Sequence, residues 1–254
     1  MYYRAARAIV WLWHRKSYAK TRSGESLPHL VKDHQSFLLR PLKDVQMRLQ
    51  YNKITNLMLA IACIDGLIIR PGETFSIWRL VGKPSTRKGY LPGLVLNQGK
   101  IEEGIGGGLC QLGNLIFWMV LHTPLSIKER YRHGYDVFPD INRKIPFGAG
   151  ATLSYNYIDL QIKNETQQAY QLKLWLSDEH LHGAIFCEQP PQEYYEVYEA
   201  HHRIVHQWWG GYTRHNQIKR RVYHTSSHEL LRDEWVLENH AIMMYEPLLS
   251  AGQA

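Results

Sequence analysis

A run of three glycines, followed by a cysteine and a helical pattern, constrains this chain more than any other feature. The stretch GIGGGLCQLGNLIFWMVLHTPL covers residues 104–125. Apolar residues after the cysteine recur at the i, i+3, i+4, i+7 and i+8 spacing of a helix with one buried face. They are Leu112, Leu115, Ile116, Met119 and Val120. Pro124 stops the pattern. We therefore expect a central helix with Cys110 at its N-terminus.

Strand patterns, in which apolar and polar residues alternate, occupy most of the chain after this helix. Two long candidate hairpins pair Glu193–Gln207 with Tyr212–His224 and Leu230–Asn239 with Ala241–Tyr245. Residues 1–45, in contrast, have a basic and helical pattern. Helices and strands thus fall in separate blocks, without regular βαβ alternation, and we predict an α+β fold. It combines a helical N-terminal third, the central helix carrying the cysteine, and a β-rich remainder of antiparallel hairpins.

Three segments are expected within the 254 residues, of which 44% are hydrophobic, enough for a sizeable core. Residues 1–48 form a helical segment, residues 49–190 a core domain, and residues 191–254 a β-rich extension packed on the core. The Pro190-Pro191 pair marks the second junction.

The N-terminal residues predict a basic amphipathic helix. Its apolar run, Ala8 to Trp13, is shorter than the apolar segment of a signal peptide. No stretch of about 18 apolar residues occurs anywhere, so we expect no helix that spans a bilayer. We expect the N-terminal helix to dock on the body, with peripheral contact to an anionic membrane as the alternative. The expected location is cytoplasmic or peripherally membrane-associated.

The net charge of +7 favours an anionic partner: a nucleic acid, a membrane surface or an acidic substrate. Most of the excess is spread along the chain, so nucleic acid is not the expected partner. Basic and aromatic residues do interleave between Trp208 and Arg221, as stacking surfaces require. A hairpin turn with cross-strand aromatic packing fits that segment equally well.

Three widely spaced cysteines, Cys63, Cys110 and Cys187, form no CxxC pair and no zinc pattern. We therefore predict no metal, no cofactor and at least one free thiol. At a helix start, the Cys110 sulfur would lie beside unpaired N–H groups that favour the thiolate. The same donors would stabilise an oxyanion formed when a carbonyl is attacked.

Neighbouring residues extend this prediction of a reactive cysteine. Gly107 and Gly108 remove side chains and would let a substrate approach the backbone closely. Gln111 would add a side-chain donor to the oxyanion site.

A thiol nucleophile also needs a base, and His133 lies 23 residues further on, just past a predicted strand. Asp136 and Asp140 are the candidate acids to orient its ring. This order of cysteine, helix, strand, histidine and acid is analogous to that of papain-like and transglutaminase-like enzymes.

Two interpretations in which Cys110 is not a nucleophile stay open. Free cysteines are usually buried and inert, and a glycine-rich loop before a helix often binds an anion. A phosphate loop is excluded, since no Lys-Ser/Thr pair follows Gly108. The anion-binding interpretation predicts a carboxylate or phosphate group as the ligand at the helix start.

Taken together, these motifs resemble the VanW family, which is named for a protein of vancomycin-resistance clusters. The resemblance rests on PGETFS at residues 71–76, on the GGxCQ pattern that ends at Gln111, and on the downstream His133. It extends from about Ile54 to Asn164 and appears again near the C-terminus.

The resemblance implies a role in cell-wall peptidoglycan and antibiotic resistance. Proteins with this domain include L,D-transpeptidases, in which the motif cysteine is acylated by one stem peptide and a second stem's amine accepts the acyl group. Cys110 then corresponds to the nucleophile and His133 to the family histidine. Gly150 stands where many relatives carry Asp, so Asp136 or Asp140 would have to orient the histidine here.

Two functions are therefore carried forward. The first is a cysteine acyltransferase of L,D-transpeptidase type that acts through a thioester on a peptidoglycan stem peptide. The second is a non-catalytic accessory protein that binds a cell-wall precursor or another anionic ligand at the glycine loop. The substitution Cys110→Ser separates the two, because only the enzyme needs the sulfur.

Overall fold

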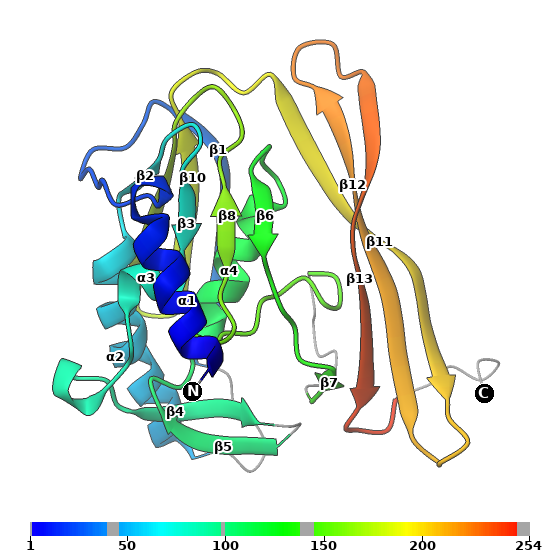
Figure 1. The fold of residues 1–254 in the computed structure, drawn as a ribbon. Helices are drawn as coiled ribbons and strands as arrows, with labels where there is room; N and C mark the ends of the chain where they lie inside the picture. The colour runs from blue at the N-terminus through cyan, green and yellow to red at the C-terminus, as the bar shows by residue number, and fades with distance from the viewer. Residues whose placement is uncertain (1, 40–45, 98–99, 138–144, 248–254) are drawn as a thin grey trace.

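One layer of the body is a four-stranded antiparallel sheet with strand order β1-β10-β9-β2 (Figure 1). The computed structural model describes residues 2–39, 46–97, 100–137 and 145–247. The strands of this sheet are β1 (His29–Phe37), β10 (His180–Cys187), β9 (Tyr170–Leu176) and β2 (Leu67–Ile69). Helices α2 (Met47–Ile64) and α4 (Cys110–Val120) pack against it.

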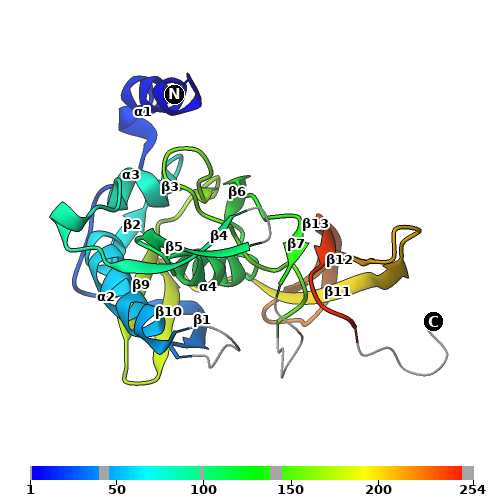
Figure 2. The same ribbon diagram turned by 90° about the horizontal axis from the view of Figure 1, so that it is seen from below.

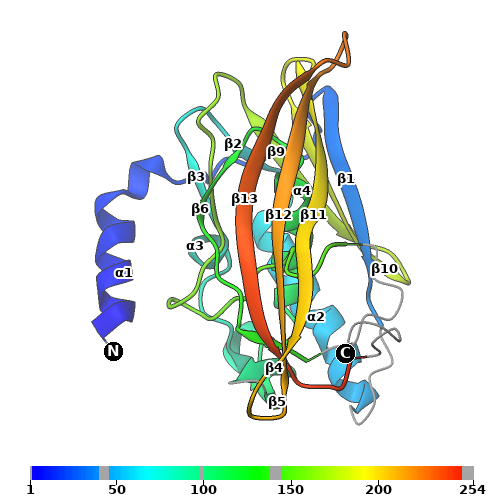
Figure 3. The ribbon, with the colours of Figure 1, turned by 90° about the vertical axis from the view of Figure 1, so that its right-hand side faces the viewer.

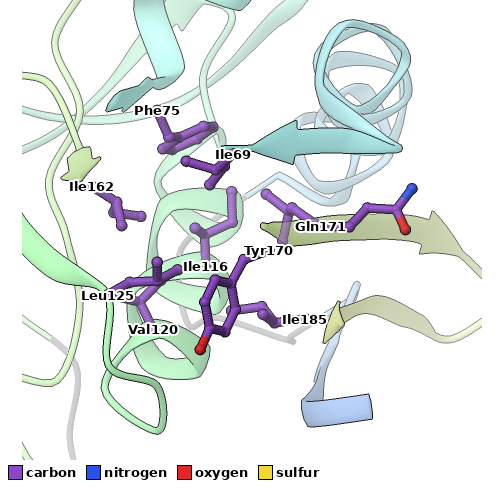
Figure 4. Close-up of a pocket in the computed structure, with 10 residues that line it drawn as sticks. Ile69, Phe75, Ile116, Val120, Leu125, Ile162, Tyr170, Gln171 and Ile185 are labelled. Carbon is purple, nitrogen blue, oxygen red and sulfur yellow. The ribbon is translucent and has the colours of Figure 1, made fainter. Parts of the chain in front are cut away.

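A smaller sheet, with strand order β3-β8-β6, lies on the other side of α4. Its strands are β3 (Thr74–Ser76), β8 (Gln161–Lys163) and β6 (Ser126–Glu129), and the short helices α3 (Ile77–Val81) and η2 (Thr86–Lys88) follow β3 in the chain. Side chains from both sheets and from α4 meet in Figure 4, around an apolar cavity of about 10 Å³. That volume is about the size of one water molecule. The cavity is therefore a packing gap in the core and too small for a ligand.

The helix that carries the cysteine is buried along most of its length. Its apolar face contributes Leu112, Leu115, Ile116, Phe117 and Met119, which are among the largest fully buried side chains. Next to this layer, β4 (Pro92–Asn97) and β5 (Lys100–Ile105) form the antiparallel hairpin that leads into the glycine loop. The first turn of α4 therefore emerges from the core at Cys110, which is exposed.

Three long strands form a separate C-terminal sheet beside the body (Figures 1 and 3). They are β11 (Glu193–His206), β12 (Tyr212–His224) and β13 (Leu230–Met243). The two-residue strand β7 (Tyr135–Asp136) completes this sheet by pairing in parallel with the end of β13. Contacts with the body include Ile218, which is fully buried in the common core, and Arg220, whose guanidinium donates to the carbonyl of Thr123 at 2.9 Å.

The predicted α+β class is confirmed, but the helical N-terminal third is wrong. The N-terminal residues begin with α1 (Tyr2–Trp13) and η1 (Arg15–Ser17), and then β1 extends along the edge of the main sheet. Nine residues of β1 alternate in exposure as an edge strand does. Its partner β10 lies about 150 positions later in the chain, so local sequence carries little of the signal.

The last predicted hairpin is also wrong, because β13 is continuous through His240, where the turn was expected, directly after Asn239. Asn239 is buried there, and its amide donates to Asn216 on β12 at 2.8 Å. A polar residue that looks like a turn in sequence therefore serves as a buried cross-strand link. The preceding hairpin, β11 with β12, matches its predicted boundaries within one residue. The three predicted segments stay a prediction.

Candidate functional site

The glycine loop before α4 is shaped by close contacts within the protein. Gly106 and Gly108 have positive φ angles, which favour glycine. Gly107 lies so close to Gly93 of β4 that a Cβ at either position would overlap the backbone of the other. A Cβ on Gly108 would overlap the side-chain stem of Lys53 from α2. Gly107 and Gly108 therefore serve packing in this structure, and the faces expected to receive a substrate are occupied by β4 and α2.

A buried asparagine on α2 fixes the position of this loop. Asn56 donates to the carbonyl of Gly107 at 2.9 Å and to the carbonyl of Leu91 at 3.0 Å. Its side-chain oxygen accepts the N–H of Leu91 at 2.8 Å. The Gly108 N–H donates to Leu94 at 2.9 Å. These contacts join α2, β4 and the loop into one unit that presents the start of α4.

Cys110 is the exposed cysteine of the three. Cys187 is buried and Cys63 is half-buried, and both thiols donate to backbone carbonyls, of Gln189 and Leu59 respectively. Although Cys110 is exposed as a residue, the protein atoms around its thiol desolvate it, and this burial raises its pKa. Hydrogen bonds from the backbone N–H groups of Leu153 and of Cys110 itself oppose that rise. The resting form is therefore the thiol, although the backbone donors at the helix start favour the thiolate.

The segment around Thr152 connects the cysteine with the histidine. Leu153 directs its N–H toward the Cys110 sulfur, while the Thr152 hydroxyl accepts the N–H of His133 at 3.1 Å. Ala151 is held against α4, since its N–H donates to the Asn114 side chain at 2.8 Å. Cys110 and His133 thus contact neighbouring residues of one segment. Within the part of the chain that the structure describes, no hydrogen bond joins the sulfur to the imidazole ring.

The His133 ring is suited to accept a proton. Burial lowers the pKa of His133, and the positive charge of Arg132 lowers it further. A contact with the Tyr135 backbone and the charge of Asp136 partly oppose this shift. The ring is therefore neutral at pH 7. Its Nδ1 is buried and has no hydrogen-bond partner among the described residues, and an unpaired buried nitrogen of this kind often marks a functional position.

The structure describes the first of the two candidate acids, Asp136, but not the second, Asp140. Asp136 is buried in β7, and its carboxylate contacts the Arg214 guanidinium at 3.3 Å and accepts the Tyr245 hydroxyl at 2.9 Å. The charge of Asp136 raises the pKa of His133, while its oxygens bind Arg214 and Tyr245. Asp140 lies outside the described residues. The acid that orients His133 therefore stays a prediction.

The Gln111 side chain points to β1. Its amide donates to the Ser36 hydroxyl at 2.9 Å and to the Phe37 carbonyl at 2.8 Å. In this structure it ties the first turn of α4 to the end of that strand. The donors that face the sulfur are backbone N–H groups instead, and the side-chain donor expected at Gln111 has no part in the arrangement.

Sequence reasoning missed the role of Asn114, four residues after the cysteine. A Cβ on Gly150 would lie 2.5 Å from the Asn114 side-chain oxygen. The missing side chain at Gly150 thus leaves the space that Asn114 uses to bind Ala151. The signal available in sequence was the pair itself, a glycine in the GAGAT segment and an asparagine on the helix face that bears Cys110.

The described residues contain neither a metal-binding cluster nor a membrane-spanning helix. They contain no group of three or more His, Cys, Asp or Glu side chains arranged to hold a metal ion. None of the helices in the described ranges is both long and apolar enough to cross a bilayer.

Comparisons with known proteins define the class. The family model described as "VanW like protein" matches residues 52–186, and the chain belongs to this family. The resemblance drawn from the motifs is therefore confirmed. Among its relatives is the "Vancomycin B-type resistance protein VanW" of Enterococcus faecalis, which is 38% identical over 195 residues, covering 77% of this chain and 71% of that protein.

A second relative shares a shorter region. The "Uncharacterized protein YoaR" of Bacillus subtilis is 34% identical over 113 residues, covering 44% of this chain and 36% of that protein. No solved structure matches the chain.

Proposed function

We propose that this protein is a cysteine-dependent acyltransferase of L,D-transpeptidase type that acts on a cell-wall stem peptide and contributes to vancomycin resistance. The observation that carries the proposal is the position of Cys110, an exposed residue at the start of α4, with two backbone N–H groups directed at its sulfur. The resistance role comes from the name of the Enterococcus faecalis relative.

The proposed reaction has two steps. The Cys110 thiol gives its proton to the neutral His133 ring while the sulfur bonds to the carbonyl carbon of a stem-peptide amide. The amine leaves with that proton, and a thioester remains. The amine of a second stem attacks the thioester, forms the cross-link and restores the thiol. The N–H groups of Leu153 and Cys110 would hold the oxyanion in both steps.

Since the raised pKa of Cys110 leaves little thiolate at pH 7, the enzyme needs His133 at the sulfur when substrate binds. Catalytic hydrogen bonds are often long in the unliganded state and shorten in the complex. Both residues contact the segment of Thr152 and Leu153, so a small shift of that segment changes the distance between them. The neutral state of His133 supports its role as the base.

The test is to incubate the protein with purified stem tetrapeptides and measure its intact mass. The proposal expects an acyl adduct on Cys110 that is absent in Cys110→Ala and unchanged in Cys63→Ala, which alters the half-buried thiol of α2. His133→Gln should slow adduct formation and change its pH profile. An unacylated Cys110 with every stem peptide tried, together with a fully active Cys110→Ser variant, would contradict the proposal.

The raised pKa of Cys110 also favours a second function, that of an accessory protein that binds a cell-wall precursor without chemistry. On that function Cys110→Ser keeps vancomycin resistance in a complemented strain. The anion would have to bind elsewhere than against Gly107 and Gly108, since chain segments already cover those glycines.

A further inference from the structure

Helix α1 presents an apolar stripe away from the body. Ile9, Leu12 and Trp13 have exposed fractions of 58%, 67% and 83%. At about 100° per residue these three positions, with Ala5, lie on one side of the helix. Figures 2 and 3 show α1 at one side of the molecule, with no other helix or strand beyond it. An apolar stripe that faces water on a separate helix indicates a surface for a partner.

The opposite side of α1 holds it in place. The Arg7 guanidinium forms a two-pronged contact with the Glu129 carboxylate, both distances 2.7 Å. Trp11, one turn further on, packs against the core, and its carbonyl accepts a hydrogen bond from Arg79 at 3.2 Å. The helix thus docks through Arg7 and Trp11. This docking fixes its rotation and leaves the apolar stripe uncovered.

The positive charge around the stripe indicates that its partner is anionic. The first 24 residues contain no Asp or Glu and six Lys or Arg. Arg15, Lys16 and Lys20 are exposed and follow the end of the helix in the chain. A second copy of the chain would bring an equally basic segment against this one, and like charges repel. An apolar stripe bordered by cations is instead complementary to an anionic lipid surface.

We propose that α1 lies flat in the interface of an anionic membrane. Ile9, Leu12 and Trp13 insert below the headgroups, and Arg15 and Lys16 contact lipid phosphates. The bidentate Arg7 contact keeps the body on the water side with a fixed face toward the bilayer. This proposal is independent of the acyltransferase function.

The test uses the full chain in co-sedimentation with two kinds of vesicle, pure phosphatidylcholine and a mixture with phosphatidylglycerol. The two basic residues that contact lipid, Arg15 and Lys16, predict roughly 30-fold tighter binding to the anionic vesicles, falling as salt is raised. The double substitution Ile9→Ser with Leu12→Ser should weaken that binding at least about tenfold. Val10→Ser, on the flank of the same helix and 49% exposed, is the matched control and should bind nearly as the parent does.

Thermal unfolding of each variant checks folding, and these exposed sites should leave the midpoint unchanged. Equal binding to both vesicle types, or full binding by the double variant, would overturn the proposal. Light scattering of the protein without lipid tests whether the stripe binds a second copy of the chain instead. Concentration-dependent dimers that disappear in the double variant would assign the stripe to a second copy and also overturn it.

Discussion

Gly107→Ala is the substitution that most directly tests why the loop before Cys110 is made of glycine. In the structure the Gly107 backbone lies against Gly93, and a Cβ on Gly107 would overlap the carbonyl group of Gly93 and lie 2.6 Å from the Leu94 nitrogen. Gly107 does not have a positive φ angle, so the effect of a methyl group there is steric. Both contacts are backbone atoms, which cannot rotate away as a side chain can.

The cost follows from what must move. Separating the two segments stretches the hydrogen bonds from Asn56 to Gly107 and from Gly108 to Leu94, both 2.9 Å long. Each such bond contributes roughly 1 kcal/mol, and overpacking adds roughly 1–3 kcal/mol. We expect the free energy of unfolding to fall by about 3–5 kcal/mol. For a chain of this size that lowers the melting temperature by about 10 °C.

Urea unfolding followed by circular dichroism measures this difference. The matched control is Gly24→Ala, where a Cβ would meet nothing within 4 Å. That change should be neutral or stabilise by about 0.5 kcal/mol. If the two alanine variants were equally stable, the packing argument would be refuted and a ligand-binding role for the glycine would regain support. If Gly107→Ala is strongly destabilised, its loss of activity says nothing about ligand binding.

Three further outcomes are expected from urea unfolding. Burial lowers the pKa of His122 to about 4. Because the unfolded chain binds more protons than the folded protein between pH 6.5 and 4, the free energy of unfolding falls by up to about 3 kcal/mol on acidification. His122→Gln should remove this loss. Burial raises the pKa of Asp159 to about 6, so its contribution has the opposite sign. The parent should lose up to about 3 kcal/mol relative to Asp159→Asn as pH rises from 4 to 6, and an equal pH dependence of the two proteins would contradict this. Asn56→Ala leaves the carbonyls of Gly107 and Leu91 without their buried donor and should cost about 3 kcal/mol, against little change for a surface asparagine.

The sequence pattern was sufficient to predict the helices and strands whose hydrogen-bond partners are close in the chain. The helix that begins at Cys110 was predicted from its apolar spacing, and the β11–β12 hairpin from alternation around a turn. The strand β1 was missed because its hydrogen bonds go to β10, far along the chain. An edge strand with one exposed face has little pattern of its own.

The sequence predicted the cysteine of the candidate site better than the residues around it. Cys110 could be chosen from its helical phase and the glycines before it. The N–H of Leu153, the N–H of Ala151 that binds Asn114, and the hydroxyl of Thr152 come from a segment without regular strand or helix. Their contacts depend on tertiary packing, which no local spacing encodes.

The parallel pairing of β7 with β13 has a consequence for how this family can vary. His133 lies two residues before β7, and that strand is held by Ile242 and Met243 of β13 and by Arg214 of β12. The family match ends at residue 186. The matched residues include both Cys110 and His133, whereas β12 and β13, which hold β7, lie beyond them. Substitutions in β12 or β13 would therefore move the histidine without any change to the residues around Cys110, so the two parts of the candidate site can vary separately.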